Sequence, residues 1–401
     1  MRINLSYLFT IFLAVLLLYF GHRFAVEGRF SFYDNSQEHA RATVQRIIER
    51  IQAEDFLDFF DDDARYSDTG DNAGSGDEFL EYDDFFMALI GEKIIFEAEI
   101  NSGRRKGQLI RAEQSLSDYS MITPKEVAEG DSILLINTNI GWFYNGHVHT
   151  NGLFALGIIF AICILIFGRT KGFNTILSLG FTVGSVFYVF IPAILAGKNI
   201  YLMSSLVCFY TTVITLLLVI GYSKKSLAAA IGCISGILTA GIITIIMDRV
   251  LQLTGVVDEY SRHLINLPLR TAIDLKAIIF AGITIGAMGA IMDVAMSIAS
   301  SMWEIKEEAK SIKFNALFRS GLNIGRDIMG TMANTLILAY IGSSLSVVLV
   351  LSVYSNSLME LLNREMIMVE ILQALAGSFG ILFAMPLTAF FCSVFYLKKS
   401  N

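Results

Sequence analysis

Two aspartates, Asp293 and Asp327, interrupt stretches of sequence that are otherwise largely apolar. Asp293 belongs to a series of small and polar residues spaced three or four apart, namely Gly282, Gly286, Gly289, Asp293, Ser297, Ser300 and Glu304. Residues with this spacing share one face of a helix. Because small residues let a neighbouring helix approach closely, the three glycines predict a helix-packing face that ends in a carboxylate.

A second polar series lies in the next apolar stretch, where Asn323, Asp327, Gly330 and Asn334 are spaced four, three and four apart. These residues also share one helix face. Carboxylates inside membrane helices normally face protein or water and mark ion or substrate paths. We therefore expect the two faces to meet, with Gly330 at a helix contact and with a path lined by Asp293, Asp327, Asn334, Asn323, Ser297 and Ser300.

Structural roles for the two aspartates stay open. Asp293 could pair with Arg326 or with a lysine, and Asp327 at the start of a helix would complement the helix dipole. A catalytic carboxylate dyad is disfavoured, because Arg326 precedes Asp327 and opposes a shared proton. The path hypothesis requires both carboxylates to face protein, with the two helix axes about 8–10 Å apart.

The composition explains which elements hold these residues. The 401-residue chain is 54% hydrophobic and 17% charged, with a mean hydropathy of +0.58, whereas soluble proteins carry roughly a quarter charged residues. Runs of about 20 apolar residues can cross a bilayer as helices. They predict a polytopic α-helical membrane protein with about eight transmembrane helices, near 4–23, 152–168, 173–196, 199–221, 226–247, 274–300, 331–353 and 369–397.

The runs divide the chain into an N-terminal membrane anchor over 1–24, a domain over 25–150 and a seven-helix transmembrane domain over 151–401. Short segments rich in β-branched residues predict strands in the middle part and a small barrel. Basic residues gather in the short loops of one side, which indicates the cytoplasm. We therefore expect both termini in the cytoplasm and residues 25–150 extracytoplasmic.

Two features of the middle domain suggest cation binding without establishing it. Residues 53–86 hold 13 acidic residues and one basic residue, a composition typical of disordered segments, and they lack a complete calcium-loop register. His147 and His149 share a face of an extended chain. Two ligands do not make a metal site, so the histidines are interpreted as a polar pair at the membrane interface.

Motifs for catalysis are not found. The sequence has no P-loop, no G-x-S-x-G and no H-E-x-x-H, and its four cysteines all fall in apolar runs, where they predict neither a disulfide framework nor a thiol metal site. We expect no enzymatic activity, no cofactor, no bound metal and no nucleic-acid partner. Residues 302–322 combine charges with an apolar stripe and predict an amphipathic interfacial helix anchored by Trp303.

Two segments carry a family resemblance. GAMGAIMDVAMSIASSMWEI at 286–305 and GRDIMGTMANTLILAYIG at 325–342 resemble the YibE/F-like bacterial multitransmembrane proteins. The layout of an anchor, a small outer β domain and a helix cluster is similar too. The resemblance implies this topology in a bacterial cytoplasmic membrane and draws attention to Asp293 and Asp327, but it implies no reaction.

These observations favour a membrane permease or ion-coupled transporter of unknown substrate, with a polar seam between the sixth and seventh transmembrane helices. The alternative is a non-catalytic membrane scaffold or sensor whose outer domain binds a partner, because small-residue faces also serve assembly. The expected partners are the lipid bilayer, a small ion or small-molecule substrate, and a second copy of the chain or another membrane protein.

Overall fold

The structure is a computed structural model that describes residues 5–26, 38–51, 92–116, 125–138, 140–267, 272–309, 311–355 and 357–397. The chain divides into two compact units, Ser31–Phe160 in one and Met1–Phe30 with Ala161–Asn401 in the other. The acidic insert predicted over 53–86 lies outside the described residues.

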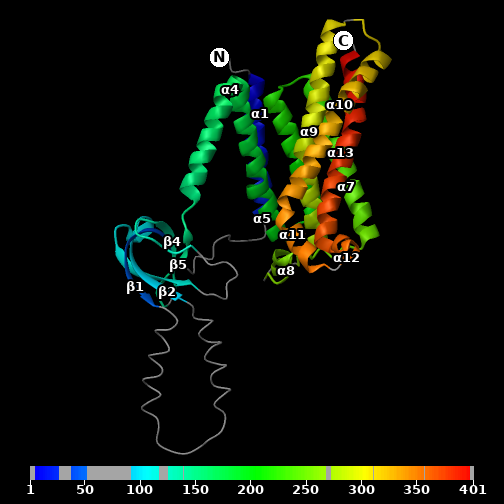
Figure 1. Cartoon of the computed structure of the whole chain (residues 1–401). Helices are drawn as coiled ribbons and strands as arrows, with labels where there is room; N and C mark the ends of the chain where they lie inside the picture. The colour runs from blue at the N-terminus through cyan, green and yellow to red at the C-terminus, as the bar shows by residue number, and fades with distance from the viewer. Residues whose placement is uncertain are drawn as a thin grey trace, which may run out of the picture. The chain divides into compact units, whose positions relative to one another are not determined.

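The smaller unit contains a closed β-barrel (Figure 1). Its described strands follow the order β1-β2-β3-β5-β4 around the barrel and are β1 (Glu38–Ile51), β2 (Glu92–Ile100), β3 (Leu109–Leu116), β4 (Ser132–Asn137) and β5 (Trp142–His147). The long strand β1 pairs antiparallel with both β2 and β4. Two register shifts in β1 bend it around the barrel. The predicted small β-barrel is confirmed.

Alternation along the strands explains the barrel core. In β2 the side chains of Ile94, Phe96, Ala98 and Ile100 are almost completely buried, as expected where successive residues point to opposite faces. The intervening Glu97 faces outward and forms an ion pair with Arg46 of β1, with 2.8 Å between carboxylate and guanidinium. The barrel therefore has an apolar interior and a charged exterior.

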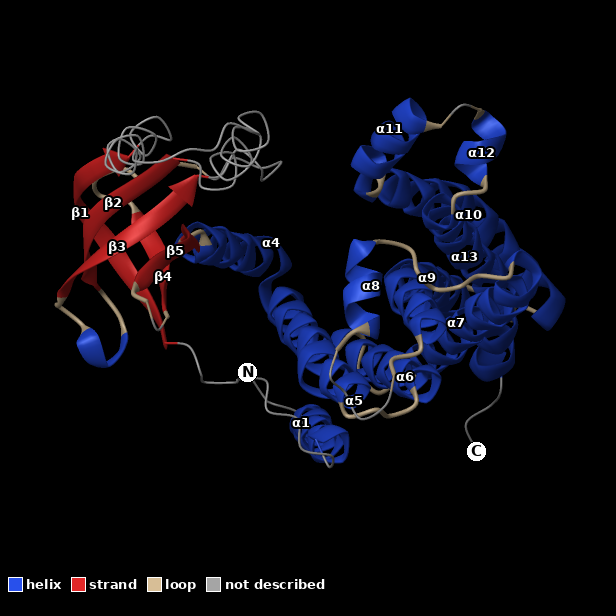
Figure 2. Cartoon of the chain, turned by 90° about the horizontal axis from the view of Figure 1, so that it is seen from below, coloured by secondary structure: helices blue, strands red, loops and turns tan. Residues whose placement is uncertain are grey.

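The larger unit is helical (Figure 2). Its elements are α1 (Leu5–Val26), α4 (Thr150–Gly184), the π-helix η2 (Ser185–Phe190), α5 (Ile191–Leu195), α6 (Ile200–Val219), α7 (Lys224–Leu251), α8 (Glu259–Ile265), α9 (Leu275–Glu308), α10 (Phe314–Ser343), α11 (Leu345–Tyr354), α12 (Leu358–Leu362) and α13 (Glu365–Leu397). The helix α4 follows the barrel in the sequence, and its first residues belong to the smaller unit. Among the described residues, 6 helical segments are long and apolar enough to cross a membrane, or 7 if the bent pair α10 and α11 counts as one span. A membrane-embedded helical protein is confirmed.

One of those segments, Thr150–Leu195, is 46 residues long and holds the second and third predicted spans. At Arg169 the backbone leaves the helical region, with φ 48° and ψ −124°. A Cβ atom on Gly172 would lie 2.2 Å from the Ile164 carbonyl oxygen, so only glycine fits there. The chain turns at this point, between the predicted spans 152–168 and 173–196 (Figure 1).

The seventh predicted span is interrupted. α10 and α11 meet at 60°, near Ser344, inside the predicted span 331–353. The hydroxyl of Ser344 donates to the Tyr340 carbonyl oxygen at 2.7 Å, as does that of Ser343 at 2.9 Å. Such bonds from serine to the helix backbone bend helices, so a pair of serines at the break accounts for its place.

The predicted interfacial helix over 302–322 is wrong. α9 continues to Glu308, and α10 begins at Phe314, so the charged stretch consists of the last turns of one helix, a short connection and the first turns of the next. Its apolar residues pack inside the unit, because Leu317 is fully buried and the Trp303 ring lies 5.1 Å from that of Tyr396. The apolar stripe of residues 302–322 therefore marks packing inside the helical unit, including packing against α13, and not a membrane interface.

The core of the larger unit forms where α9 packs against α6, α7, α10 and α13, and α7 packs along α13. In the view of Figure 2 these helices group together. A Cβ atom on Gly236 of α7 would lie 2.7 Å from the Gly380 carbonyl oxygen of α13. Small residues therefore let these two backbones touch.

Candidate functional site

The two faces of α9 differ sharply in burial. Its inner face consists of apolar side chains that are fully buried, among them Ile283, Ala287, Ile291 and Ile298. The predicted stripe occupies the opposite face, as the helical period requires. On that face Gly282, Gly286, Gly289 and Asp293 are exposed, while Ser297 and Ser300 are partly exposed.

Asp293 lies well inside α9, between Leu275 and Glu308, and its side chain is exposed in the single chain. Among the residues that the structure describes, it forms no ion pair with Arg326 or with any other basic side chain. The alternative in which Asp293 pairs with Arg326 is therefore wrong for the described residues. An exposed carboxylate within a span-length helix is available to a solute or to a partner.

The polar residues of α10 face away from the bundle. Leu317, Gly321, Gly325 and Leu336 are the buried residues of this helix, and they pack toward α9 and α13. Asn323, Asp327, Gly330 and Asn334 are all exposed on the opposite face. Asp327 is also far from the helix start at Phe314, which rules out its predicted dipole-capping role.

The expected meeting of the two polar faces is thus not found within the described residues. α10 contacts α9 through apolar side chains and through Tyr340, whose hydroxyl would lie 2.6 Å from a Cβ atom on Gly286. The polar face of α10 points roughly opposite to its packed face. Asp293 and Asp327 therefore lie on two separate exposed faces of neighbouring helices.

The glycines predicted to pack are mostly open. A Cβ atom on Gly289 or Gly330 would meet no atom within 4 Å, and one on Gly282 would meet only the Gln373 amide nitrogen, at 3.5 Å. Gly289 and Gly330 therefore make no close helix contact in the single chain, whereas Gly286 lies against Tyr340 of α10. The close contacts are made by other glycines, including Gly236, Gly325, Gly377 and Gly380.

Sequence reasoning missed a third carboxylate, Glu370 of α13. Its side chain is partly buried, and its Oε2 atom is shielded from solvent and has no hydrogen-bond partner among the described residues. It lies within Coulombic range of the Tyr340 hydroxyl. The available signal was its position just inside the predicted span 369–397, where an acidic residue is unusual.

Comparison with known proteins gives a consistent assignment. A family model described as YibE/F-like protein matches residues 156–398, which is more than half of the chain.

The chain belongs to the YibE/F-like family.

The resemblance found in the sequence is thereby confirmed. The matched segment of this YibE/F-like chain contains α9, α10 and α13, and with them Asp293, Asp327 and Glu370. The comparisons with curated proteins and with solved structures find no match.

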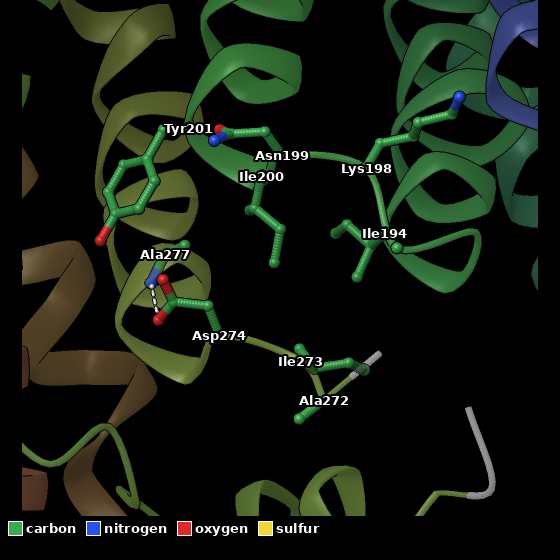
Figure 3. Close-up of a pocket in the computed structure, with 10 residues that line it drawn as sticks. Ile194, Lys198, Asn199, Ile200, Tyr201, Ala272, Ile273, Asp274 and Ala277 are labelled. Atoms are coloured by element: carbon green, nitrogen blue, oxygen red, sulfur yellow. Dashed lines mark hydrogen bonds between the residues drawn. The ribbon is translucent and has the colours of Figure 1, made fainter. Parts of the chain in front are cut away.

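A small polar pocket of the YibE/F-like chain lies where the loop before α6 faces the start of α9 (Figure 3). Its volume is about 210 Å³. Asp274 accepts a hydrogen bond from the Ala277 backbone at 3.2 Å, and Asn199 accepts one from Leu202 at 3.0 Å. The Lys198 side chain extends away from Asp274 (Figure 3) and lies 4.4 Å from the centre of the Phe24 ring. These groups cap two helices, which is a structural role.

In the barrel of the YibE/F-like protein, three polar side chains are linked by hydrogen bonds. His147 contacts the Asp131 carboxylate at 3.1 Å through Nε2 and the Tyr144 hydroxyl at 2.5 Å through Nδ1. A carboxylate only accepts, so Nε2 donates to Asp131, and Nδ1 is hydrogen-bonded to the Tyr144 hydroxyl. Both ring nitrogens are therefore engaged, and the described residues contain no group of three metal-binding side chains.

Interactions within this cluster shift the pKa values of two of its members. A hydrogen bond from the Ala128 backbone, followed by the bond from His147, lowers the pKa of Asp131. Burial, followed by the Asp131 charge, raises the pKa of Tyr144. The cluster lines an open pocket that also includes Lys125 and His149, whose ring stacks on that of His147 at 6.3 Å.

Proposed function

We propose that this YibE/F-like protein is a membrane permease or ion-coupled transporter, and that the exposed polar face of α9 is part of its path. The observation that carries the proposal is Asp293, an exposed carboxylate without an ion pair among the described residues, inside a helix of span length. Holding a charged aspartate at mid-membrane costs roughly 2.5–3.5 kcal/mol on insertion scales. A residue with this cost and no packing role fits an ion or substrate path.

The proposal includes a membrane topology of eight passes. These are α1, the two parts of the segment Thr150–Leu195 on either side of Arg169, α6, α7, α9, α10 with α11, and α13. Basic residues then gather on one side, in the turns after Gly168 and Tyr222 and in the connection before Phe314. By the positive-inside rule that side is the cytoplasm of a bacterial cell, and the barrel is extracytoplasmic.

The exposed polar face of α10 requires a covering. Lipid cannot hydrogen-bond to Asn323, Asp327 and Asn334, and polar groups in membrane helices face protein or a water-filled cavity. The proposal therefore includes a second copy of the chain, or another membrane protein, beside α10. In such an assembly the path would be bounded by protein on both sides.

The first test is a ligand screen by thermal unfolding of the purified protein in detergent. Protons (as pH), Na⁺, K⁺, Mg²⁺, Ca²⁺ and Mn²⁺ are varied, with Asp293→Asn beside the wild type. A ligand at 100 times its Kd stabilises a protein by about 2.7 kcal/mol. An ion that stabilises the wild type but not Asp293→Asn supports the proposal.

The second step is flux of that ion into proteoliposomes. Asp293→Asn is expected to abolish flux, while Glu259→Gln, a change in the first turn of α8, is the matched control and is expected to leave it intact. Flux that survives Asp293→Asn in full would remove α9 from the path and leave the proposal without support.

A second candidate is a membrane scaffold or sensor whose barrel binds a partner. The observation that favours it is the open barrel pocket beside Asp131, Tyr144 and His147. Under this alternative, cells carrying Asp293→Asn keep the wild-type phenotype, whereas a His149→Ala, Lys125→Ala double variant loses it. Under the transport proposal the two variants show the reverse pattern.

A further inference from the structure

Glu370 belongs to α13, which packs against both α9 and α10. One turn along α13, the Gln373 side chain lies against Gly282 of α9, and the Tyr340 hydroxyl of α10 lies against Gly286. A Cβ atom on Gly286 would come within 2.6 Å of that hydroxyl. The two glycines therefore leave room for a phenol and an amide beside the carboxylate.

The same helix offers a direct contrast. Glu365, five positions earlier in the sequence, accepts hydrogen bonds from the Thr254 and Gly255 backbones and from the Thr254 hydroxyl, at 2.7 to 2.8 Å. Glu370 Oε2 is shielded from solvent and accepts none from any described residue. The first carboxylate has a structural role, whereas the packing around the second supplies no such role.

Among the described residues, charged groups that could neutralise Glu370 are engaged elsewhere or distant along their helices. On α9, Lys276 pairs with Asp248 at 3.5 Å, and the next titratable residue, Asp293, lies two turns beyond Gly286. On α12, Glu360 pairs with Arg364 at 2.7 Å. On α10 the titratable group within Coulombic range is Tyr340, and a neutral phenol offers a hydrogen bond but no positive charge.

A carboxylate in such surroundings reaches a low free energy by taking up a proton, since burying an unpaired charge is far more costly than burying a neutral acid. A divalent cation is a poorer match. Hard cations require six or more oxygen ligands, and the described residues contain no cluster of three acidic, histidine or cysteine side chains.

We propose that Glu370 is a proton-binding site of the membrane unit and that Tyr340 positions it. Gly282, Gly286 and Gly289 lie along the exposed face of α9 between the Gln373 contact and Asp293, over about 16 Å at 1.5 Å per residue. Glu370 lies near the start of α13, five residues after Glu365, whereas Asp293 lies near the middle of α9. Only the coupling of this proton to transport rests on the proposed function.

The test is labelling with N,N′-dicyclohexylcarbodiimide, an apolar reagent that couples to protonated carboxylic acids. The full-length wild-type protein in detergent is labelled over a series of pH values, digested, and mapped by mass spectrometry. We expect label on Glu370 and not on Glu365, and a labelling rate that falls about tenfold per pH unit above the titration midpoint. Absence of label on Glu370 at every pH, in protein that is folded by size exclusion, would overturn the inference.

Two variants separate a positioning role for Tyr340 from a structural one. Tyr340→Phe removes the hydroxyl but keeps the ring, and it is expected to move the pH midpoint of Glu370 labelling without changing the unfolding temperature. Glu370→Gln is expected to lose the label, and Glu365→Gln to keep it. An unchanged pH profile in Tyr340→Phe would remove Tyr340 from the site.

The labelling readout is independent of transport. If no ion is transported but Glu370 labels as expected, the proposed function fails and the proton site stands. If flux depends on Asp293 but Glu370 never labels, the proton site fails and the transport proposal stands.

Discussion

The inner and outer faces of α9 both carry small residues, but the inner face packs closely against neighbouring helices, whereas the outer face is largely open. The inner face carries Ala287, Ala295 and Ala299, all fully buried against neighbouring helices. The outer face carries three glycines and Asp293, and it is exposed in the single chain. Small residues thus serve close packing on one face, while on the other they leave space beside polar groups.

This difference separates residues that hold the fold from residues that are free for another role. A residue at a close helix contact cannot change without moving a backbone, whereas a residue on an open face can change without loss of packing. Stability measurements on matched pairs of variants can test the separation, and loss of the predicted difference in any pair would weaken it.

The largest effect is expected at the α7–α13 contact. In Gly236→Leu the added side chain would meet the Gly380 backbone oxygen at 2.7 Å and the Ala384 Cβ at 2.8 Å, and neither is the end of a flexible side chain. We expect a loss of at least about 3 kcal/mol, enough to prevent accumulation of folded protein. Gly289→Leu is the control, since its Cβ meets nothing within 4 Å.

The measurement is the yield of monodisperse protein in size exclusion, followed by thermal unfolding of the fraction recovered. If Gly289→Leu fails to fold as completely as Gly236→Leu, the outer face of α9 must be packed against a partner in the native assembly. That result would identify the covered face.

A smaller difference is expected between two residues of α10. Leu336 is 8% exposed and packs against Gly377, so Leu336→Ala should lower the free energy of unfolding by about 2–5 kcal/mol. Asn334, two residues earlier, is exposed, and Asn334→Ala should change it by no more than about 0.5 kcal/mol. Thermal unfolding of the monomeric fraction in detergent measures both, and equal losses would show that the Asn334 face is buried within the single chain.

Sequence periodicity predicted the faces of α9 and α10 but not their neighbours. The spacing of Asp293 and Asp327 correctly assigned each to one helix face, because helix geometry is local. Which face packs inward depends on the arrangement of α7 and α13, which is set by contacts such as Gly236 with Gly380. Nothing in the spacing around Gly289 distinguishes an open glycine from a packed one.

The barrel and the family were predictable for a different reason. Alternation in β2 and the runs of β-branched residues are strong local signals, and the motifs around Asp293 and Asp327 carried the resemblance. Glu370 was not selected, since its distinguishing property is a buried carboxylate oxygen without a hydrogen-bond partner among the described residues. The link between Asp131 and His147 joins positions 16 apart in the sequence, on different strands or loops, and was equally invisible.

A modest effect is expected for a carboxylate that does have partners. The pKa of Asp131 is lowered in the folded state, so its contribution to stability is present above its ordinary value of 3.8 and is lost as the pH falls through the lower folded value. Asp131→Asn should therefore be less stable than the wild type at neutral pH, by about 1 kcal/mol. The difference should shrink in acid, where the wild type loses this contribution.

Trp142 of the barrel reports this transition by fluorescence in a Trp303→Phe background, since the chain has two tryptophans. Glu97→Gln is the control, because the Glu97 partner Arg46 is largely exposed, at 66% of its side chain, and such pairs contribute little. A difference between Asp131→Asn and wild type that persists unchanged at low pH would show that the hydrogen bonds do not depend on the charge.

The smallest effect on stability is expected at the carboxylate proposed to line the path. Asp293 has no ion pair among the described residues, so Asp293→Asn removes a charge without breaking a contact, and the free energy of unfolding should stay within about 0.5 kcal/mol of the wild type or rise. Glu365→Gln is the contrasting variant, since Glu365 accepts hydrogen bonds from Thr254 and Gly255 and their weakening should destabilise. Both are compared by thermal unfolding in the same detergent. A drop for Asp293→Asn as large as that for Glu365→Gln would mean that Asp293 holds the assembly together, and the distinction between packed and open faces of α9 would then fail at its central residue.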